Sequence, residues 1–174
     1  MEPLTLRIYP DPILRRSCKK VMTFDSELRD LADAMIDTMC QEGGIGLAAP
    51  QVGFDKCLII ALRMADPEDT HAEPAVLINP KVVSSSSELW SYEEGCLSIP
   101  GVSASILRSV KVDIEFQDVD GDTHRSTEEG MFARILQHEI DHLNGRLFID
   151  YLSDAQKSLL RNQLKKLADS HTAS

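Results

Sequence analysis

Two histidines and a glutamate stand together in the last third of the sequence, in the segment His138-Glu139-Ile140-Asp141-His142. On a helix, residues four apart project from one face, so the two imidazoles can hold one metal ion while Glu139 lies beside them. This spacing is a specific pattern for metal-dependent hydrolysis, in which the carboxylate acts as a general base. The alternative interpretation is a helix that carries two surface or core histidines and no metal.

A catalytic metal site of this kind needs a third protein ligand and one position left open for water. One known pattern places a histidine six residues after the second histidine, but that position holds Phe148 here. Another pattern uses a downstream glutamate, and none follows Glu139. Of the remaining downstream groups, we keep Asp150 alone as a candidate.

The third ligand is therefore expected upstream of the histidine pair. His71 and His124 lie in a polar loop and after a predicted hairpin turn, where a solvated histidine is the ordinary interpretation. Cys96 lies in the tight segment Glu94-Gly95-Cys96-Leu97-Ser98 and can bind metal as a thiolate. The residues by themselves favour Cys96, His138 and His142 as the ligand set.

Helical periodicity predicts three helices that would position or support these groups. Apolar residues from Leu28 to Met39 recur at helical spacing, with Asp25 or Ser26 as N-cap and Gly43-Gly44 as the stop. The histidines lie on a second helix, from about Glu129 to Leu143. A last helix begins at the capping-box pattern Ser153-Asp154-Ala155-Gln156.

Strand-like segments lie between the first two helices. Apolar runs at Cys57–Leu62 and Val76–Val83 predict two strands separated by a polar loop, 66–74. Alternating residues from Val110 to Phe116, followed by the turn Asp120-Gly121 and the segment 122–128, predict an antiparallel hairpin. Helices mixed unevenly with antiparallel strands predict an α+β fold. We expect one domain over residues 1–169 and a frayed tail over 170–174.

Composition narrows the class of protein. A chain of 174 residues with 43% hydrophobic residues can fill one core, and it shows no apolar run of the length that a signal peptide or membrane span requires. The net charge of −10 argues against generic nucleic-acid binding, and nothing indicates a membrane partner. The four cysteines at irregular spacing are expected to be reduced thiols of a cytoplasmic protein.

Three separated segments together resemble the signature motifs of the peptide deformylases. They are the segment 44–51, which reads Gly-Ile-Gly-Leu-Ala-Ala-Pro-Gln, the segment 94–98 around Cys96, and the segment 137–142 with the histidine pair. The similarity extends over nearly the whole chain. It implies antiparallel sheets packed around a central metal-binding helix, with a C-terminal helix. It also implies an enzyme that removes the formyl group from the N-terminal formylmethionine of nascent polypeptides and releases formate.

The resemblance implies a role for each motif residue. Cys96, His138 and His142 would be the metal ligands, and Glu139 would be the general acid/base while a metal-bound water attacks the formyl carbon. Gln51, through its side-chain amide, and Leu97, through its backbone NH, would stabilise the developing oxyanion.

The substrate would bind as an added strand along the backbone near Ile45-Gly46 and Glu94-Gly95. The methionine side chain would enter an apolar pocket formed by Ile45, Met131, Ile135 and His138. Many relatives carry an arginine a few residues after the cysteine motif, and Ser103 stands at that position here. This difference bears on preference at the second and third substrate residues.

Two further expectations come from the resemblance. The metal would be Fe²⁺ in the cell, with Zn²⁺, Ni²⁺ or Co²⁺ possible, because donor type alone does not choose among these ions. The C-terminal helix would offer a basic face for docking on the ribosome, through Lys157, Arg161, Lys165 and Lys166. The opposing interpretation of that face is a solvated helix surface.

Two other classes of function remain as alternatives. A metallopeptidase could use the same helix on unblocked peptides, although the missing downstream ligand argues against it. A binding module could hold the metal for structural reasons, but structural sites usually have four protein ligands, and no fourth cysteine or histidine is well placed.

Overall fold

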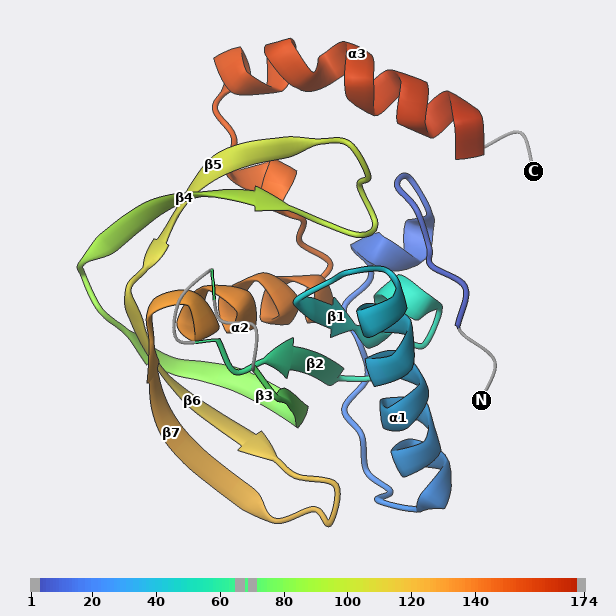
Figure 1. Ribbon diagram of the computed structural model, residues 1–174, viewed down its shortest axis with the longest axis vertical. Helices are drawn as coiled ribbons and strands as arrows, with labels where there is room; N and C mark the ends of the chain where they lie inside the picture. The colour runs from blue at the N-terminus through green and yellow to red at the C-terminus, as the bar shows by residue number, and fades with distance from the viewer. Residues whose placement is uncertain (1–3, 65–67, 69–71, 172–174) are drawn as a thin grey trace.

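A computed structural model describes residues 4–64, 68 and 72–171. It contains one five-stranded antiparallel sheet in the order β1-β2-β3-β6-β7 and a separate antiparallel hairpin, β4-β5 (Figure 1). The strands are β1 (Gly46–Ala48), β2 (Leu58–Leu62), β3 (Pro74–Ser85), β4 (Leu89–Gly95), β5 (Ser103–Ser109), β6 (Lys111–Gln117) and β7 (Thr123–Glu129). The helices are α1 (Ser26–Gln41), α2 (Gly130–Leu143) and α3 (Asp154–His171), with short 3-10 turns η1 (Pro12–Arg15), η2 (Ala49–Val52) and η3 (Phe148–Tyr151).

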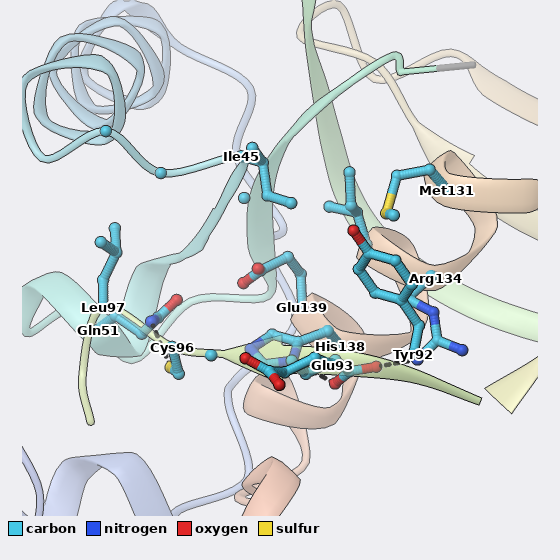
Figure 2. A pocket seen from close by; sticks show the side chains of 16 residues that line it. Ile45, Gln51, Tyr92, Glu93, Cys96, Leu97, Met131, Arg134, His138 and Glu139 are labelled. Carbon is cyan, nitrogen blue, oxygen red and sulfur yellow. Dashed lines mark hydrogen bonds and ion pairs between the residues drawn. The ribbon is translucent and has the colours of Figure 1, made fainter. Parts of the chain in front are cut away.

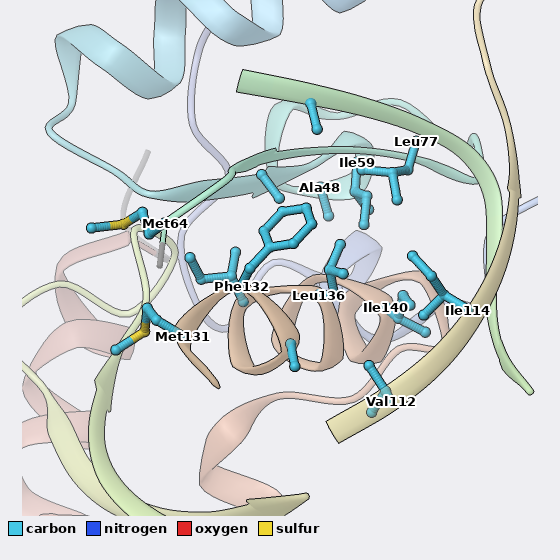
Figure 3. Packing of buried hydrophobic residues seen from close by; sticks show 14 of the residues in the cluster. Ala48, Ile59, Met64, Leu77, Val112, Ile114, Met131, Phe132, Leu136 and Ile140 are labelled. Atoms are coloured by element: carbon cyan, nitrogen blue, oxygen red, sulfur yellow. The ribbon is translucent and has the colours of Figure 1, made fainter. Parts of the chain in front are cut away.

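Helix α2 lies between the five-stranded sheet and the hairpin and is buried on nearly every side (Figure 1). Phe132, Leu136 and Ile140, spaced four apart, form the stripe that packs on the sheet against residues such as Ile59 and Ile114 (Figure 3). The opposite stripe faces the hairpin and contains the two histidines. A helix that is buried on most sides has apolar residues on most faces, so the few polar residues of α2 are conspicuous in the sequence.

Helix α1 covers the other face of the sheet. Its residues Leu28, Met35 and Met39 pack with Leu58 and Ile60 of β2, while the alternate residues of β2 face α2. Strand β2 is therefore buried on both faces, as its continuous apolar sequence requires. Of the two predicted N-caps, Asp25 is the one that caps the helix: its carboxylate accepts the Leu28 NH, and Ser26 is the first helical residue.

The hairpin and the C-terminal helix form a smaller apolar cluster. Ile99, Val102 and Ile106 pack with Leu14 and with Phe148 of η3. Helix α3 contributes only half-buried leucines to this cluster and has no fully buried residue, and it crosses above the hairpin in Figure 1. Its N-terminal capping box forms as predicted, with the Gln156 side chain accepting the Ser153 NH.

The predicted α+β fold, with antiparallel sheets around a central helix and a C-terminal helix, is confirmed. The sequence patterns did not predict β1, which is three residues long, or either strand of the hairpin. Strand β4 turns Trp90, Tyr92 and Glu94 toward α2, while Leu89 faces solvent at 56% exposure, so its polarity does not alternate as in an ordinary half-buried strand. Much of the loop 66–74 lies outside the described residues. Helix α3 includes residues 170 and 171 of the predicted tail, and the last three residues lie outside the description.

Candidate metal centre

Three donor atoms from two distant segments meet at the centre of the molecule. His138 and His142 project from one face of α2, and Cys96 follows directly after the end of β4. The Cys96 Sγ and His142 Nε2 are 3.3 Å apart, and the two Nε2 atoms of the histidines are also 3.3 Å apart. Among residues 4–64, 68 and 72–171, this trio is the one group of such ligands whose donor atoms all lie within 4.8 Å of one another.

The surroundings of the trio fit a bound divalent metal ion. A thiolate and two imidazoles form a donor set typical of catalytic zinc and iron sites, and three protein ligands leave one position open. Burial, reinforced by the positive charges of His138 and Arg108, lowers the pKa of His142 well below its ordinary value. The His142 ring is therefore neutral, which is the form that binds metal.

Glu94 orients the first histidine. Its Oε2 lies 3.0 Å from His138 Nδ1, and this contact would keep a proton on Nδ1 when a bound metal replaces the proton on Nε2. Glu94 also accepts two hydrogen bonds from Arg108, at 2.6 and 2.9 Å, and one from Arg134 at 2.5 Å. Burial by itself raises the pKa of Glu94, but the hydrogen bonds from His138 and Arg108 and the Arg108 charge outweigh it and hold the pKa at about 2. Glu94 is therefore ionised at neutral pH.

Glu139 is the buried acid beside the ligands. It is 4% exposed, and its Oε2 has no hydrogen-bond partner among the described residues. Burial, against the positive charges of His138 and Arg108, raises the pKa of Glu139 to about 7 in the metal-free protein. A carboxylate with an unpaired oxygen and a pKa near neutrality can both accept and return a proton.

Gly46 provides the space in which the Glu139 carboxylate lies. A Cβ atom at Gly46 would be 2.3 Å from Glu139 Oε1 and 2.9 Å from the Cγ and Cδ atoms. No side chain larger than hydrogen fits there unless Glu139 moves. The absence of a side chain at Gly46 therefore leaves room for the Glu139 carboxylate.

Gln51, on turn η2, directs its amide nitrogen toward the trio. The Ala48 NH donates to Gln51 Oε1 at 2.8 Å, so the side chain is fixed with Nε2 on the inner side. There Nε2 lies 3.4 Å from Cys96 Sγ (Figure 2) and 3.2 Å from Ser98 Oγ. Gln51 is 1% exposed, although from the sequence it reads as a polar loop residue.

Gln51, Cys96, His138 and Glu139 form the base of a cavity of about 390 Å³ (Figure 2). All six residues predicted to bind substrate line it: Ile45, Gly46, Glu94, Gly95, Met131 and Ile135. Leu97 lines it as well, and Ile45 is 44% exposed at its surface. The sequence patterns did not identify Tyr92, Glu93 or Arg134 as lining residues. Tyr92 and Glu93 lie on β4, whose polarity does not alternate, whereas Arg134 lies four residues before His138 and so on the same face of the predicted helix.

The other candidate ligands are placed elsewhere. The Asp150 carboxylate pairs with Arg15 at 2.6 Å and accepts the Leu147 NH, and it is not part of the ligand group. His124 pairs with Asp118 at 2.6 Å beside the β6-β7 turn, and His71 lies outside the described residues. Ser103 Oγ donates to the exposed Glu93 carboxylate at 3.0 Å.

All four cysteines are free thiols. No helix in the described part of the chain has the length and apolar character needed to cross a membrane.

Comparison with known proteins identifies the family. The family model of polypeptide deformylase matches residues 3–158. A peptide deformylase of Rhizobium meliloti is 45% identical over 168 residues, which cover 97% of this chain and 95% of the relative, and one of Bradyrhizobium diazoefficiens is 46% identical over 92% of this chain and 94% of the relative. Among solved structures, a plant peptide deformylase superposes with a TM-score of 0.92 at 39% identity, covering 98% of this chain and 92% of the other. A Plasmodium falciparum peptide deformylase gives 0.90 at 37% identity, covering 98% of both chains.

Proposed function

The chain belongs to the polypeptide deformylase family, and from this premise we propose a role for each residue at the base of its cavity. The protein is a metal-dependent hydrolase that removes the formyl group from the N-terminus of nascent polypeptides. The observation that carries the assignment of roles is the ligand trio beside a buried carboxylate with an unpaired oxygen. In our proposal, Cys96, His138 and His142 hold the metal and Glu139 moves the proton.

A bound metal would act as a Lewis acid and would lower the pKa of the water that it holds. Glu139 would accept a proton from the water molecule that adds to the formyl carbon. As the bond between carbon and nitrogen breaks, Glu139 returns the proton to the leaving amine, and formate is released. The same carboxylate therefore acts first as base and then as acid, which suits its pKa of about 7 in the metal-free protein.

Two donors face the oxygen on which negative charge develops. The Gln51 amide, fixed by the Ala48 NH, supplies one hydrogen bond. The backbone NH of Leu97, next to Cys96, supplies the other. A single donor of this kind typically contributes a factor of about 10² to 10³ in kcat, because its hydrogen bond is strongest when the charge is fully formed.

The substrate is a chain end that lies along the cavity between β1 and β4. We propose that the backbone near Gly46 and Gly95 pairs with the extended peptide and that the methionine side chain enters between Ile45, Met131 and Ile135. The carboxylate of Glu94 does not face substrate in this scheme, because it is bound to His138, Arg108 and Arg134. Its contribution to substrate binding is therefore through the backbone.

The decisive test is formate release from a formyl-Met dipeptide by protein loaded with Fe²⁺, Ni²⁺ or Zn²⁺, with an unblocked Met dipeptide and a chelator as controls. Glu139→Gln is expected to keep the metal and to lose a factor of about 10² to 10⁴ in kcat. Cys96→Ala is expected to lose the metal itself. Retention of full activity by Glu139→Gln, with metal bound, would refute the role given to Glu139.

We further propose the cellular context of the enzyme. Fe²⁺ is the metal in the cell, the cytoplasm is its location, and residues 1–169 form one catalytic domain. Helix α3 docks on the ribosome through Lys157, Arg161, Lys165 and Lys166, all of which are exposed. Reversing Lys157, Arg161 and Lys165 to glutamate should abolish co-sedimentation with ribosomes and leave formate release from a dipeptide unchanged. Equal sedimentation of the variant and the wild type would remove α3 as the anchor.

A further inference from the structure

Arg134 is a buried cation on the wall of the cavity. It lies on α2 one turn before His138, is 3% exposed, and faces the hairpin (Figure 2). Burying a guanidinium is costly unless its donors are used. Its three side-chain hydrogen bonds to described residues all reach the hairpin: Nη1 donates to Glu94 Oε1 at 2.5 Å and to the Ile106 carbonyl at 3.1 Å, and Nη2 donates to the Trp90 carbonyl.

These bonds connect the two segments that supply the metal ligands. The hairpin carries Cys96, α2 carries both histidines, and the hairpin is not hydrogen-bonded into the five-stranded sheet. Arg134 reaches from the helix to the main chain of both hairpin strands. Arg108 bonds in the opposite direction, from β5 to Asp141 on α2 at 2.8 Å. Both arginines donate hydrogen bonds to the Glu94 carboxylate, so this one acid helps to fix the position of the hairpin relative to α2.

Arg134 also supports an aromatic part of the cavity wall. Its guanidinium carbon lies 4.9 Å from the centre of the Trp90 ring and 5.7 Å from that of Tyr92. The two rings are 5.0 Å apart, and they lie two residues apart on β4, so they face the same side of the strand. Tyr92 lines the cavity together with Met131 and Ile135. The Tyr92 ring therefore packs on a guanidinium whose two Nη atoms bond to the hairpin, while its buried Nε has no hydrogen-bond partner in the described part of the chain.

We propose that Arg134 is a positioning residue that fixes the Tyr92 wall and thereby sets the selectivity of the enzyme for the first side chain of the formyl peptide. This inference rests on the proposed function. A pocket with fixed walls distinguishes side chains that differ by a methylene or a branch by factors of about 10 to 200. Without Arg134, Arg108 still joins the hairpin to α2, but the Tyr92 ring loses the guanidinium behind it and can shift. The pocket then accepts longer, shorter and aromatic side chains more equally.

The test compares Arg134→Met with wild type, both loaded with Ni²⁺, on formyl-Met, formyl-Leu and formyl-Phe dipeptides. We expect kcat/KM for formyl-Met to fall about 10-fold, mainly through KM, while the values for the other two change by less than about threefold. The preference for methionine therefore falls. Arg125→Met is the matched control, because Arg125 pairs with Glu115 on the sheet and its side chain is 75% exposed. The control is expected to keep wild-type selectivity.

A second variant and a stability measurement keep the inference testable. If Arg134 merely stabilised the fold, Arg134→Met would lower Tm and leave the ratio of kcat/KM values unchanged, and that outcome would overturn the proposal. Should Arg134→Met not fold, Tyr92→Leu replaces it: loss of the methionine preference supports the proposal, and an unchanged preference overturns it. Wild type that released no formate would refute the proposed function. Wild type that prefers formyl-Met, with equal preference in the variant, would refute only the role of Arg134.

Discussion

Substituting Gly46 by alanine should disable the enzyme without unfolding it. The new Cβ would lie 2.3 Å from Glu139 Oε1, whereas ordinary contacts begin at 3.4 Å. The carboxylate must therefore retreat by about 1 Å, and since the Cγ and Cδ atoms are also too close at 2.9 Å, the whole end of the side chain moves. A misplacement of this size costs about 100-fold in rate, which corresponds to about 2.7 kcal/mol in the activation free energy.

The assay is steady-state formate release from a formyl-Met dipeptide, with metal content and Tm measured on the same samples. We expect Gly46→Ala to lower kcat by about two orders of magnitude, to retain the metal, and to change Tm by only a few degrees, because the displaced oxygens face a cavity. Gly95→Ala is the control for the clash with Glu139: its Cβ would meet only the Val102 carbonyl, at 3.8 Å, so any effect on the peptide paired with Gly95 should appear in KM and not in kcat. If kcat of Gly46→Ala stays within threefold of wild type, or Gly95→Ala loses as much kcat, the steric argument is wrong.

Three other outcomes follow from the same structure. Because the pKa of Glu94 is about 2 in the folded protein and about 4.5 when unfolded, its stabilisation is present above pH 4.5 and lost as the pH falls toward 2. As the pH falls from 4.5 toward 2, the free energy of unfolding measured in urea should drop by up to about 3 kcal/mol because Glu94 is protonated, and Glu94→Gln should not show this drop. Equal acid sensitivity of both proteins would contradict this. Maleimide labelling at pH 8, mapped by mass spectrometry, should modify the exposed Cys40 first and Cys18 last, because burial raises the pKa of Cys18 to about 12. Cys96 should react only after a chelator removes the metal. Gln51→Ala should lower kcat by about 10² to 10³ with little change in KM, and a change confined to KM would show that Gln51 binds the substrate and not the transition state.

Much of the fold could be predicted from local patterns. Helices α1 and α2 and strands β2, β3 and β6 follow from apolar spacing, because each buries a regular stripe or a continuous run. Strand β7 has no buried residue and follows instead from the turn Asp120-Gly121 after β6. Strands β4 and β5 could not be predicted this way. The side of β4 that faces α2 includes the charged Glu94, which is buried because Arg108 and Arg134 neutralise it. Charge compensation between segments distant in sequence leaves no periodic signal.

The candidate site divides in the same way. The residue types and the four-residue spacing of His138 and His142 are enough to indicate a metal and a base, since one helical turn determines their geometry. Elimination of downstream ligands favoured Cys96, and resemblance to a family supplied the substrate. The metal, the base and the third ligand could be inferred because they depend on residue types and spacing, which the sequence contains.

Only the tertiary structure shows how these groups are held. It places the Glu94 carboxylate on the His138 ring, the Glu139 carboxylate in the space that Gly46 leaves, and the Arg134 guanidinium behind the Tyr92 ring. Each of these contacts joins segments more than 40 residues apart, and each is specified by distances of a few ångströms. The sequence determines which chemical groups this protein has. The packing of the hairpin against the central helix decides which of them meet, because burial, charge and close approach act only between atoms that the fold brings into contact.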